Sequence, residues 1–174
     1  NGTNEVVTIP VVFHVVHNGD AIGVNENIAE GQILSQITVL NQDFRRMEGT
    51  PGFNTNPVGA DMEIEFCLAQ RDPYGVASTG IVRYNMGDDN GWSMEEVEML
   101  KTQTQWDPEK YLNIWVVDEI YNLAGYAQFP TGSGLEGLAG QTSTANTDGV
   151  ALGHLYVGSE DLYPEGTYDS TMLG

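Results

Sequence analysis

Three histidines are the residues of this sequence best suited to bind a metal ion or to act as a base. His14 and His17 lie three positions apart in a run of β-branched residues, and His154 lies far from both. Side chains of a strand alternate between its two faces, so positions i and i+3 point to opposite sides and cannot hold one ion together. His154 has no cysteine or histidine at the spacing of a zinc ligand. Structural roles are therefore the favoured interpretation for all three.

Two loop-like stretches combine residues that bind ions or phosphates elsewhere. The run from Asn85 to Trp92, NMGDDNGW, joins carboxylates to turn glycines. It lacks the alternating ligands and the bidentate glutamate at the twelfth position of an EF-hand loop, which favours a solvated turn. The stretch GSGLEG at 132–137 neither follows a strand of a βαβ unit nor ends in Lys-Ser or Lys-Thr, so it predicts no phosphate site.

The sequence also lacks a complete set of residues for nucleophilic catalysis. The single cysteine, Cys67, lies in MEIEFCLA, and we expect it to be a small buried apolar residue rather than a reactive thiol. The sequence contains no Gly-x-Ser-x-Gly motif. Taken by themselves, these residues include no complete catalytic constellation.

The composition is that of an acidic globular domain. The chain has 174 residues, which predicts a single domain over 1–174 with a proper core. Its 25 acidic residues against 6 basic ones give a formal charge of -19, which repels nucleic acid and anionic lipid and attracts divalent cations. No apolar run approaches the ~20 residues that span a bilayer. We expect no nucleic-acid partner and no membrane insertion, and the charge is typical of a secreted or extracellular protein.

Periodicity predicts the elements that must position these residues. The run Val6 to Val16, VVTIPVVFHVV, has so little polar alternation that it indicates a strand covered on both faces. Residues 28–46 carry apolar side chains at helical spacing and predict an amphipathic helix. In GWSMEEVEMLKTQTQW, Ser93 and Glu96 form the capping-box pattern that begins a second helix.

The remaining strands complete an α/β pattern. MEIEFCLA at 62–69 alternates apolar and polar residues, as a half-exposed strand does. KYLNIWVVDEI at 110–120 is expected to be the central strand, and LAGYAQFP and TDGVALGHLYVG give two more candidates around the glycine-rich loop. The order β-α-β-α-β-β-β predicts an α/β sandwich with a mixed sheet.

Several segments occur together in an order typical of one family of proteases. They are IPVVFHVVHNG, QILSQITVLNQDFRR, IEFCLAQRDPYG, TGIVRY, TQWDPEKYLNIWVV, GYAQFP and TDGV. In this order they resemble the pappalysin-type zinc metalloproteases, the cytophagalysin and ulilysin branch of the metzincins. The resemblance runs from about Val7 to Gly174, and WDPEKYLNIWVV followed by GYAQFP is its most specific part.

The resemblance implies a metzincin-like N-terminal subdomain. Its fold would be a twisted, mixed five-stranded sheet, mostly parallel, with an antiparallel edge strand and a backing helix near 28–46. In the family, the edge strand forms the upper rim of the cleft and pairs with a protein or peptide substrate through its main chain. Its counterpart is expected between GYAQFP and LAGQTSTANTDGV. The candidate rim residues are Gly125, Tyr126, Ala127, Gln128, Phe129 and Pro130.

The family's catalytic residues do not occur in this sequence. The active-site helix of these enzymes carries H-E-x-x-H-x-x-G-x-x-H, whose histidines bind zinc and whose glutamate acts as general base. The sequence has no His-Glu pair, and its last histidine is His154. We therefore expect the active-site helix to be absent from this chain, with GTYDSTMLG at 166–174 leading into it. Zinc is expected in the intact protein with its ligands outside this chain, and calcium, which the family allows, is not located by these residues.

Two functions remain open at this point. The first is the cleft-forming N-terminal part of a secreted zinc metalloendopeptidase, catalytically incomplete as given and favoured as one piece of a longer protease. Its bare apolar sheet face would be covered by the remaining half of the protease, by another copy or by a partner protein. The second is a non-catalytic extracellular module that uses the same sheet for binding or assembly. An independent calcium-binding surface protein, suggested by the net charge and GDDNG, ranks below both.

Overall fold

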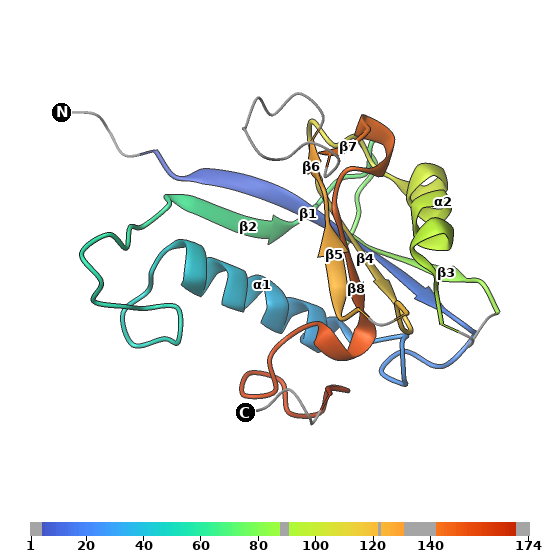
Figure 1. Cartoon of the computed structure of the whole chain (residues 1–174), viewed down its shortest axis with the longest axis horizontal. Helices are drawn as coiled ribbons and strands as arrows, with labels where there is room; N and C mark the ends of the chain where they lie inside the picture. The colour runs from blue at the N-terminus through green and yellow to red at the C-terminus, as the bar shows by residue number, and fades with distance from the viewer. Residues whose placement is uncertain (1–4, 88–90, 122, 131–141, 170–174) are drawn as a thin grey trace.

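The computed structural model describes residues 5–87, 91–121, 123–130 and 142–169. Within them, a twisted sheet has a helix on each face (Figure 1). The strands of this sheet are β1 (Val7–His17), β2 (Ile64–Leu68), β3 (Ile81–Asn85), β4 (Leu112–Val117), β5 (Gly125–Ala127) and β8 (Val150–Gly153). The helices are α1 (Glu30–Phe44) and α2 (Met94–Thr104), with 3-10 turns η1 (Ala145–Thr147) and η2 (His154–Tyr156). A small two-stranded sheet joins β6 (Phe129–Pro130) and β7 (Thr142–Ser143).

The main sheet has the order β2-β1-β4-β8-β5, with β3 also paired to β1. β1 pairs in parallel with β2 through residues 7–11 and with β3 through residues 13–17, so these two short strands share one edge of β1. The other edge of β1 pairs in parallel with β4. β5 runs antiparallel to β8 and ends the order. The predicted mixed sheet, mostly parallel with an antiparallel edge strand and a backing helix, is confirmed.

β1 is buried on both faces, as its sequence predicts. Residues 11–16 are all buried. Phe13 and its odd-numbered neighbours join the apolar cluster under α1, whereas Val16 joins the cluster under α2. A parallel strand enclosed in this way has no solvent face, which is why its sequence shows little polar alternation.

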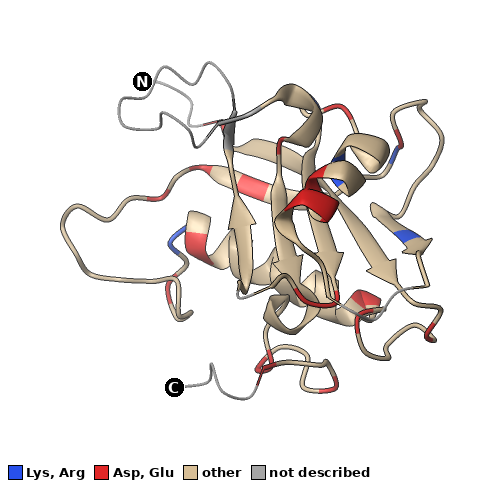
Figure 2. Ribbon diagram, turned by 45° about the vertical axis from the view of Figure 1, so that its right-hand side comes forward, with Lys and Arg blue, Asp and Glu red and all other residues tan. Residues whose placement is uncertain are grey.

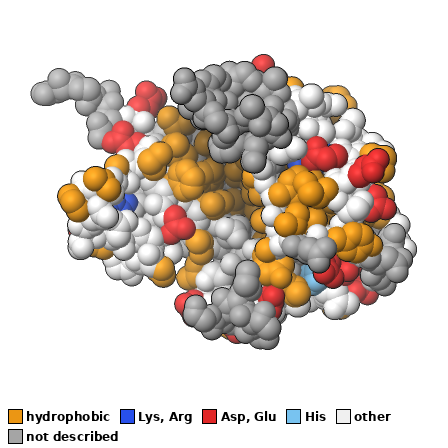
Figure 3. All heavy atoms as spheres, viewed as in Figure 1, with side chains coloured by type: hydrophobic (Ala, Val, Ile, Leu, Met, Phe, Trp, Pro, Cys, Tyr) orange, Lys and Arg blue, Asp and Glu red, His pale blue; other side chains and the backbone are white. Residues whose placement is uncertain are grey.

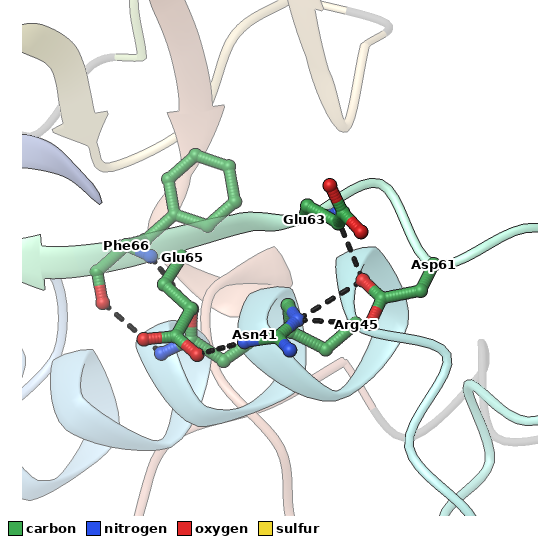
Figure 4. Close-up of polar contacts among 6 residues, drawn as sticks. All are labelled: Asn41, Arg45, Asp61, Glu63, Glu65 and Phe66. Carbon is green, nitrogen blue, oxygen red and sulfur yellow. Dashed lines mark hydrogen bonds and ion pairs between the residues drawn. The ribbon is translucent and has the colours of Figure 1, made fainter. Parts of the chain in front are cut away.

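The C-terminal half of α1 is tied to the outer edge of β2 by side chains (Figure 4). Asn41 Oδ1 accepts the main-chain N–H of Phe66 at 2.7 Å, and Asn41 Nδ2 donates to the carbonyl of the same residue at 3.0 Å. Arg45 forms ion pairs with Asp61 and Glu65 beside this contact. Asn41 thus satisfies main-chain groups that another strand would otherwise pair with, and so protects this edge of the sheet.

α2 begins at the predicted capping box. Ser93 Oγ accepts the N–H of Glu96, and the Glu96 carboxylate accepts the N–H of Ser93 at 2.9 Å. The helix packs Val97 and Leu100 against Trp115 of β4, on the face of the sheet opposite α1. The sheet is therefore the middle layer between α1 and α2.

The chain that follows β8 returns along α1 and is held there by a buried glutamine. Gln32 Nε2 donates to the carbonyls of Val157 and Thr167 at 3.0 and 2.9 Å, and Gln32 Oε1 accepts the N–H of Thr167 at 3.2 Å. Ser35 Oγ also accepts the N–H of Ser159 at 2.9 Å. These contacts fix the course of the chain as it leaves the sheet.

Two sequence-based expectations need correction. Cys67 is exposed rather than buried, because it alternates with buried Phe66 along β2 and points away from the core. β3, which lies within TGIVRY, adds a strand that the predicted element order omits. It is five residues long and half-buried, so its periodicity is weak. The sheet is still five strands wide, as predicted, because β2 and β3 pair one after the other with the same edge of β1.

Acidic residues are spread over the molecule instead of gathering in one place. Figure 2 shows Asp and Glu on both helices, on β2 and in the loops, with few Lys and Arg between them. No helix of the described ranges is long and apolar enough to cross a membrane.

Candidate functional site

An apolar groove of about 640 Å³ lies beside α1 on its face of the sheet. Figure 3 shows it as a hydrophobic hollow on the side of the molecule seen in Figure 1. Leu40 and Phe44 of α1 form one wall. The sheet side includes Ile9 from β1, Ile114 from β4, and Val150 and Leu152 from β8.

The groove exists because α1 covers one part of the sheet more fully than the other. α1 packs on β1 and β2, whereas Val150 and Leu152 of β8 are only partly buried among the described residues. The exposed lining of this hollow is mostly apolar.

The antiparallel edge strand β5 borders the same sheet. It pairs with β8 through Gly125–Leu152, Tyr126–Ala151 and Ala127–Val150, and the N–H of Gly153 donates to the carbonyl of Ala124 at 2.9 Å. Hydrogen bonding alternates along an antiparallel pair, so the main chain of Tyr126 faces β8. The N–H and C=O groups of Gly125 and Ala127 consequently point to the outer edge. An extended peptide that adds to a sheet needs groups placed in this way.

The six predicted rim residues are consecutive in the chain but belong to two sheets. Gly125, Tyr126 and Ala127 form β5, and Gln128 follows it. Phe129 and Pro130 form β6, which pairs in parallel with β7, and their side chains lie outside the described ones.

A buried polar cluster beneath β5 was not found by sequence reasoning. Lys101 of α2 is fully buried, and its Nζ lies 2.8 Å from Glu98 Oε1. The hydroxyl of Tyr126 donates to the same oxygen at 2.7 Å. Lys101 Nζ also lies 4.3 Å from the ring centroid of Tyr126 and 5.5 Å from that of Trp115. The available signal was the position of Lys101 four residues after buried Val97, on the apolar stripe of α2.

The environment of this cluster shifts its proton equilibria. Burial lowers the pKa of Lys101, although the hydrogen bond to Glu98 opposes this. Burial, and then the hydrogen bond to Glu98, raise the pKa of Tyr126. The tyrosine therefore stays a neutral hydrogen-bond donor.

His14 has the structural role expected from its strand position. Its ring stacks on Trp115 at 5.0 Å between centroids, and its Nε2 lies 2.9 Å from Asn113 Oδ1. The same oxygen accepts the N–H of Trp106, so His14 Nε2 is the donor. The hydroxyl of Tyr84 lies 3.3 Å from Nδ1. Burial lowers the pKa of His14 to about 4.

The other two histidines are also used locally. His17 Nδ1 accepts the N–H of Gly19 at 3.1 Å, and His154 Nδ1 lies 2.7 Å from the carbonyl oxygen of Asp118. No group of three or more His, Cys, Asp or Glu side chains suited to a metal ion occurs in the described part of the chain. The described residues therefore do not fit a zinc site. The acidic turn at 88–90, the glycine-rich stretch at 132–137 and the last residues at 170–174 lie outside the described ranges.

Comparison with known proteins finds close structural relatives. The chain is 36% identical to mature mirolysin from Tannerella forsythia in complex with a cleaved peptide, with a TM-score of 0.72 over 95% of this chain and 57% of that one. For mirolysin in complex with a compound, the identity is 35%, the TM-score 0.71 and the coverage 95% and 57%. For a promirolysin mutant from Tannerella forsythia, the values are 37%, 0.71, 95% and 50%.

The chain thus spans a little over half the length of the solved structures that it matches. A comparison with protein-family models and with curated proteins finds no match. Mirolysin is a pappalysin-family metalloprotease, and the similarity extends over nearly all of this chain. In sequence and in fold, this chain resembles the N-terminal half of a pappalysin-family metzincin metalloprotease.

Proposed function

We propose that this chain is the cleft-forming N-terminal part of a secreted pappalysin-like zinc metalloendopeptidase, with residues 1–174 acting as one domain. The observation that carries the proposal is the antiparallel edge strand β5, which lies at the predicted rim of a fold similar to mirolysin over 95% of the chain. The acidic surface supports the extracellular assignment, since it favours solubility and disfavours contact with nucleic acid.

The substrate is an extended peptide that adds to the sheet beside β5. The outward main-chain groups of Gly125 and Ala127 supply two donors and two acceptors at alternate positions. Glycine and alanine also leave the strand free of bulky side chains on the face opposite Tyr126. Main-chain pairing of this kind gives affinity with little dependence on sequence, so side-chain specificity falls to other parts of the protease.

The groove beside α1 receives the rest of the protease. Its apolar walls at Leu40, Phe44, Val150 and Leu152 suit the apolar face of one helix, and the matched mirolysin chains extend well beyond the region aligned here. Burial of this surface provides the free energy that joins the two halves. The zinc ligands are assigned to that remaining half, because the described residues bring no three His, Cys, Asp or Glu side chains together around a possible metal position.

The test is to express the protein with the residues that follow Gly174 in its gene and to assay peptide cleavage. We expect an H-E-x-x-H motif in the following thirty or so residues, and cleavage that a zinc chelator abolishes and added zinc restores. The 174-residue chain alone serves as the control and is expected to be inactive. Absence of the motif, or cleavage that resists chelation, would contradict the proposal.

The groove also favours a second candidate, a non-catalytic module that assembles through the same apolar surface. In that case the purified 174-residue chain would form an ordered dimer or larger assembly at micromolar concentration. Replacement of Leu40 by Glu would return it to a monomer, because a charge cannot be buried unpaired in an apolar contact. Light scattering separates the two candidates. If the purified chain stays monomeric at every concentration that can be reached, the non-catalytic module is contradicted.

A further inference from the structure

We propose that Lys101, Glu98 and Tyr126 form an anchor that sets the position of the edge strand β5 and thereby of the peptide paired with it. The inference rests on the function proposed above and adds positioning residues to it. All three are positioning residues, which act through the placement of β5.

Tyr126 is the side-chain attachment of β5 to the body of the molecule. It is the middle residue of the three-residue strand, and it packs on the apolar cluster under α2. Gly125 and Ala127, on either side, have no side chain or only a methyl group. Apart from its pairing with β8, the strand is therefore held chiefly through the Tyr126 ring and hydroxyl.

The contacts of Tyr126 lead to one rigid element. Glu98 Oε1 receives the Tyr126 hydroxyl at 2.7 Å and lies 2.8 Å from Lys101 Nζ, so one carboxylate oxygen joins the strand to the lysine. Lys101 Nζ also lies 4.3 Å from the centroid of the Tyr126 ring, within range of a cation–π contact. Glu98 and Lys101 are three residues apart on α2, whose own position on the sheet is fixed by Val97 and Leu100.

The buried ammonium group of Lys101 is not explained by stability alone. Burial of an ammonium group costs free energy that an ion pair often only offsets, and an apolar side chain of similar size can pack as well or better. A fully buried Lys101 instead restricts the neighbouring groups to arrangements that satisfy the charge. Lys101 therefore restricts where the Tyr126 side chain, and with it β5, can lie.

The consequence for the protease concerns registration of the substrate. Strand addition requires the outward groups of Gly125 and Ala127 to meet the peptide main chain in line. A displacement of about 1 Å in a positioning element can reduce activity by a large factor. Long peptides that pair along β5 would lose more from such a displacement than short peptides that reach only the cleavage point.

The experiment uses the extended, active protein and two substrates, an octapeptide and a tripeptide that share the cleaved bond. For Tyr126→Phe and Lys101→Met, we expect the KM of the octapeptide to rise about ten-fold, because a displaced β5 loses about one main-chain hydrogen bond to the peptide. The kcat for both peptides and the KM of the tripeptide are expected to change less than about two-fold. Tyr84→Phe is the matched control, because it removes a hydroxyl 3.3 Å from His14 Nδ1, packs on the same cluster under α2 and lies on β3, at the opposite edge of the sheet from β5.

A second measurement needs no catalysis. In the 174-residue chain, amide hydrogen exchange at position 126, whose N–H faces β8, is expected to speed up in Tyr126→Phe and Lys101→Met and to stay unchanged in Tyr84→Phe. If the extended wild-type protein is inactive, the proposed function is overturned. The amide exchange at position 126 still decides whether the anchor holds β5. Equal effects on both peptides, or unchanged exchange at position 126 in a folded Tyr126→Phe, would overturn the inference.

Discussion

The α2 face of the sheet is closed by side chains of the described residues, whereas the α1 face keeps an apolar groove over β4 and β8. On the α2 side, Trp115 and Val117 of β4 and Ala151 of β8 are completely buried. On the α1 side, Val150 and Leu152 of the same strand β8 remain partly exposed and line the groove. β8 is thus buried on its α2 face and partly exposed on its α1 face.

The two faces also differ in polarity. The closed face contains His14, Asn113 and Lys101, each buried with polar partners. On the α1 side, the sheet residues of the core are all aliphatic or aromatic, and the buried polar side chains Gln32 and Ser35 belong to α1 itself. Buried polar groups fix one arrangement of their neighbours, and an apolar surface adapts to whatever packs on it. Under the proposed function, the closed face is the scaffold and the open face is where the rest of the protease docks.

The largest expected effect is a difference in stability loss when a core side chain is truncated on each face of the sheet. Trp115→Ala should lower the free energy of unfolding by about 3–5 kcal/mol, because it removes a fully buried ring that stacks on His14 and donates to Thr104 Oγ1 at 2.9 Å. Leu40→Ala, in the groove wall, should cost only about 1 kcal/mol in this chain because the side chain is only partly buried. Urea denaturation of both variants checks the difference, and similar losses would mean that the groove is already filled.

The next largest effect concerns pH and the closed face. The pKa of His14 is about 4 in the fold, and about 6.5 in an unfolded chain. Between these values the unfolded chain binds the proton more readily, so stability falls as the pH drops from about 6.5 to about 4, by up to about 3 kcal/mol. His14→Gln, which carries no titrating ring, should lack this part of the slope. The test is the difference between the two unfolding profiles, since carboxylates titrate in both proteins. A parallel pair of profiles would contradict the burial of a neutral His14.

The contrast between the faces should weaken when the rest of the protease is present. In the extended protein we expect Leu40 to become fully buried, and the cost of Leu40→Ala should rise from about 1 to about 2–4 kcal/mol. Trp115→Ala should cost the same in both proteins, because its surroundings are already complete. Melting curves of the two variants in the short and extended chains provide the comparison. A cost of Leu40→Ala that does not change with chain length would remove the groove from the interface.

The sequence predicts the closed scaffold better than the site. The run around Phe13 predicts a strand buried on both faces, and Ser93 with Glu96 predicts the start of α2, because each signal depends on residues close together in the chain. The edge strand at Gly125–Ala127 was expected from the family resemblance, and the structure places a strand there. Its value as a substrate rim remains a prediction.

The parts that sequence reasoning missed depend on residues far apart in the chain. A lysine on a helix is ordinarily exposed, and Lys101 is buried only because Trp115 and Tyr126 enclose it from two other elements. Cys67 was assigned to the core from its residue type, although its alternation with Phe66 already placed it on the outer face of β2. The groove has no sequence signature of its own, because it is the space that α1 leaves over β4 and β8.

The smallest effect tests how firmly α2 closes its face. Ser93→Ala removes the hydroxyl that accepts the N–H of Glu96 and should cost about 1 kcal/mol, the usual worth of a helix N-cap. Thr102→Ala is the matched control on the same helix. Its hydroxyl donates only to the carbonyl of Glu98 within the helix, and alanine has the higher helix propensity, so it should be neutral or slightly stabilising. Because Val97 lies in the first turns of α2, the Ser93→Ala loss should appear together with faster amide exchange at positions 96 and 97. A loss without this local change would mean that α2 is held on the sheet by its C-terminal half, around Lys101, and that its N-cap contributes little to closing the face.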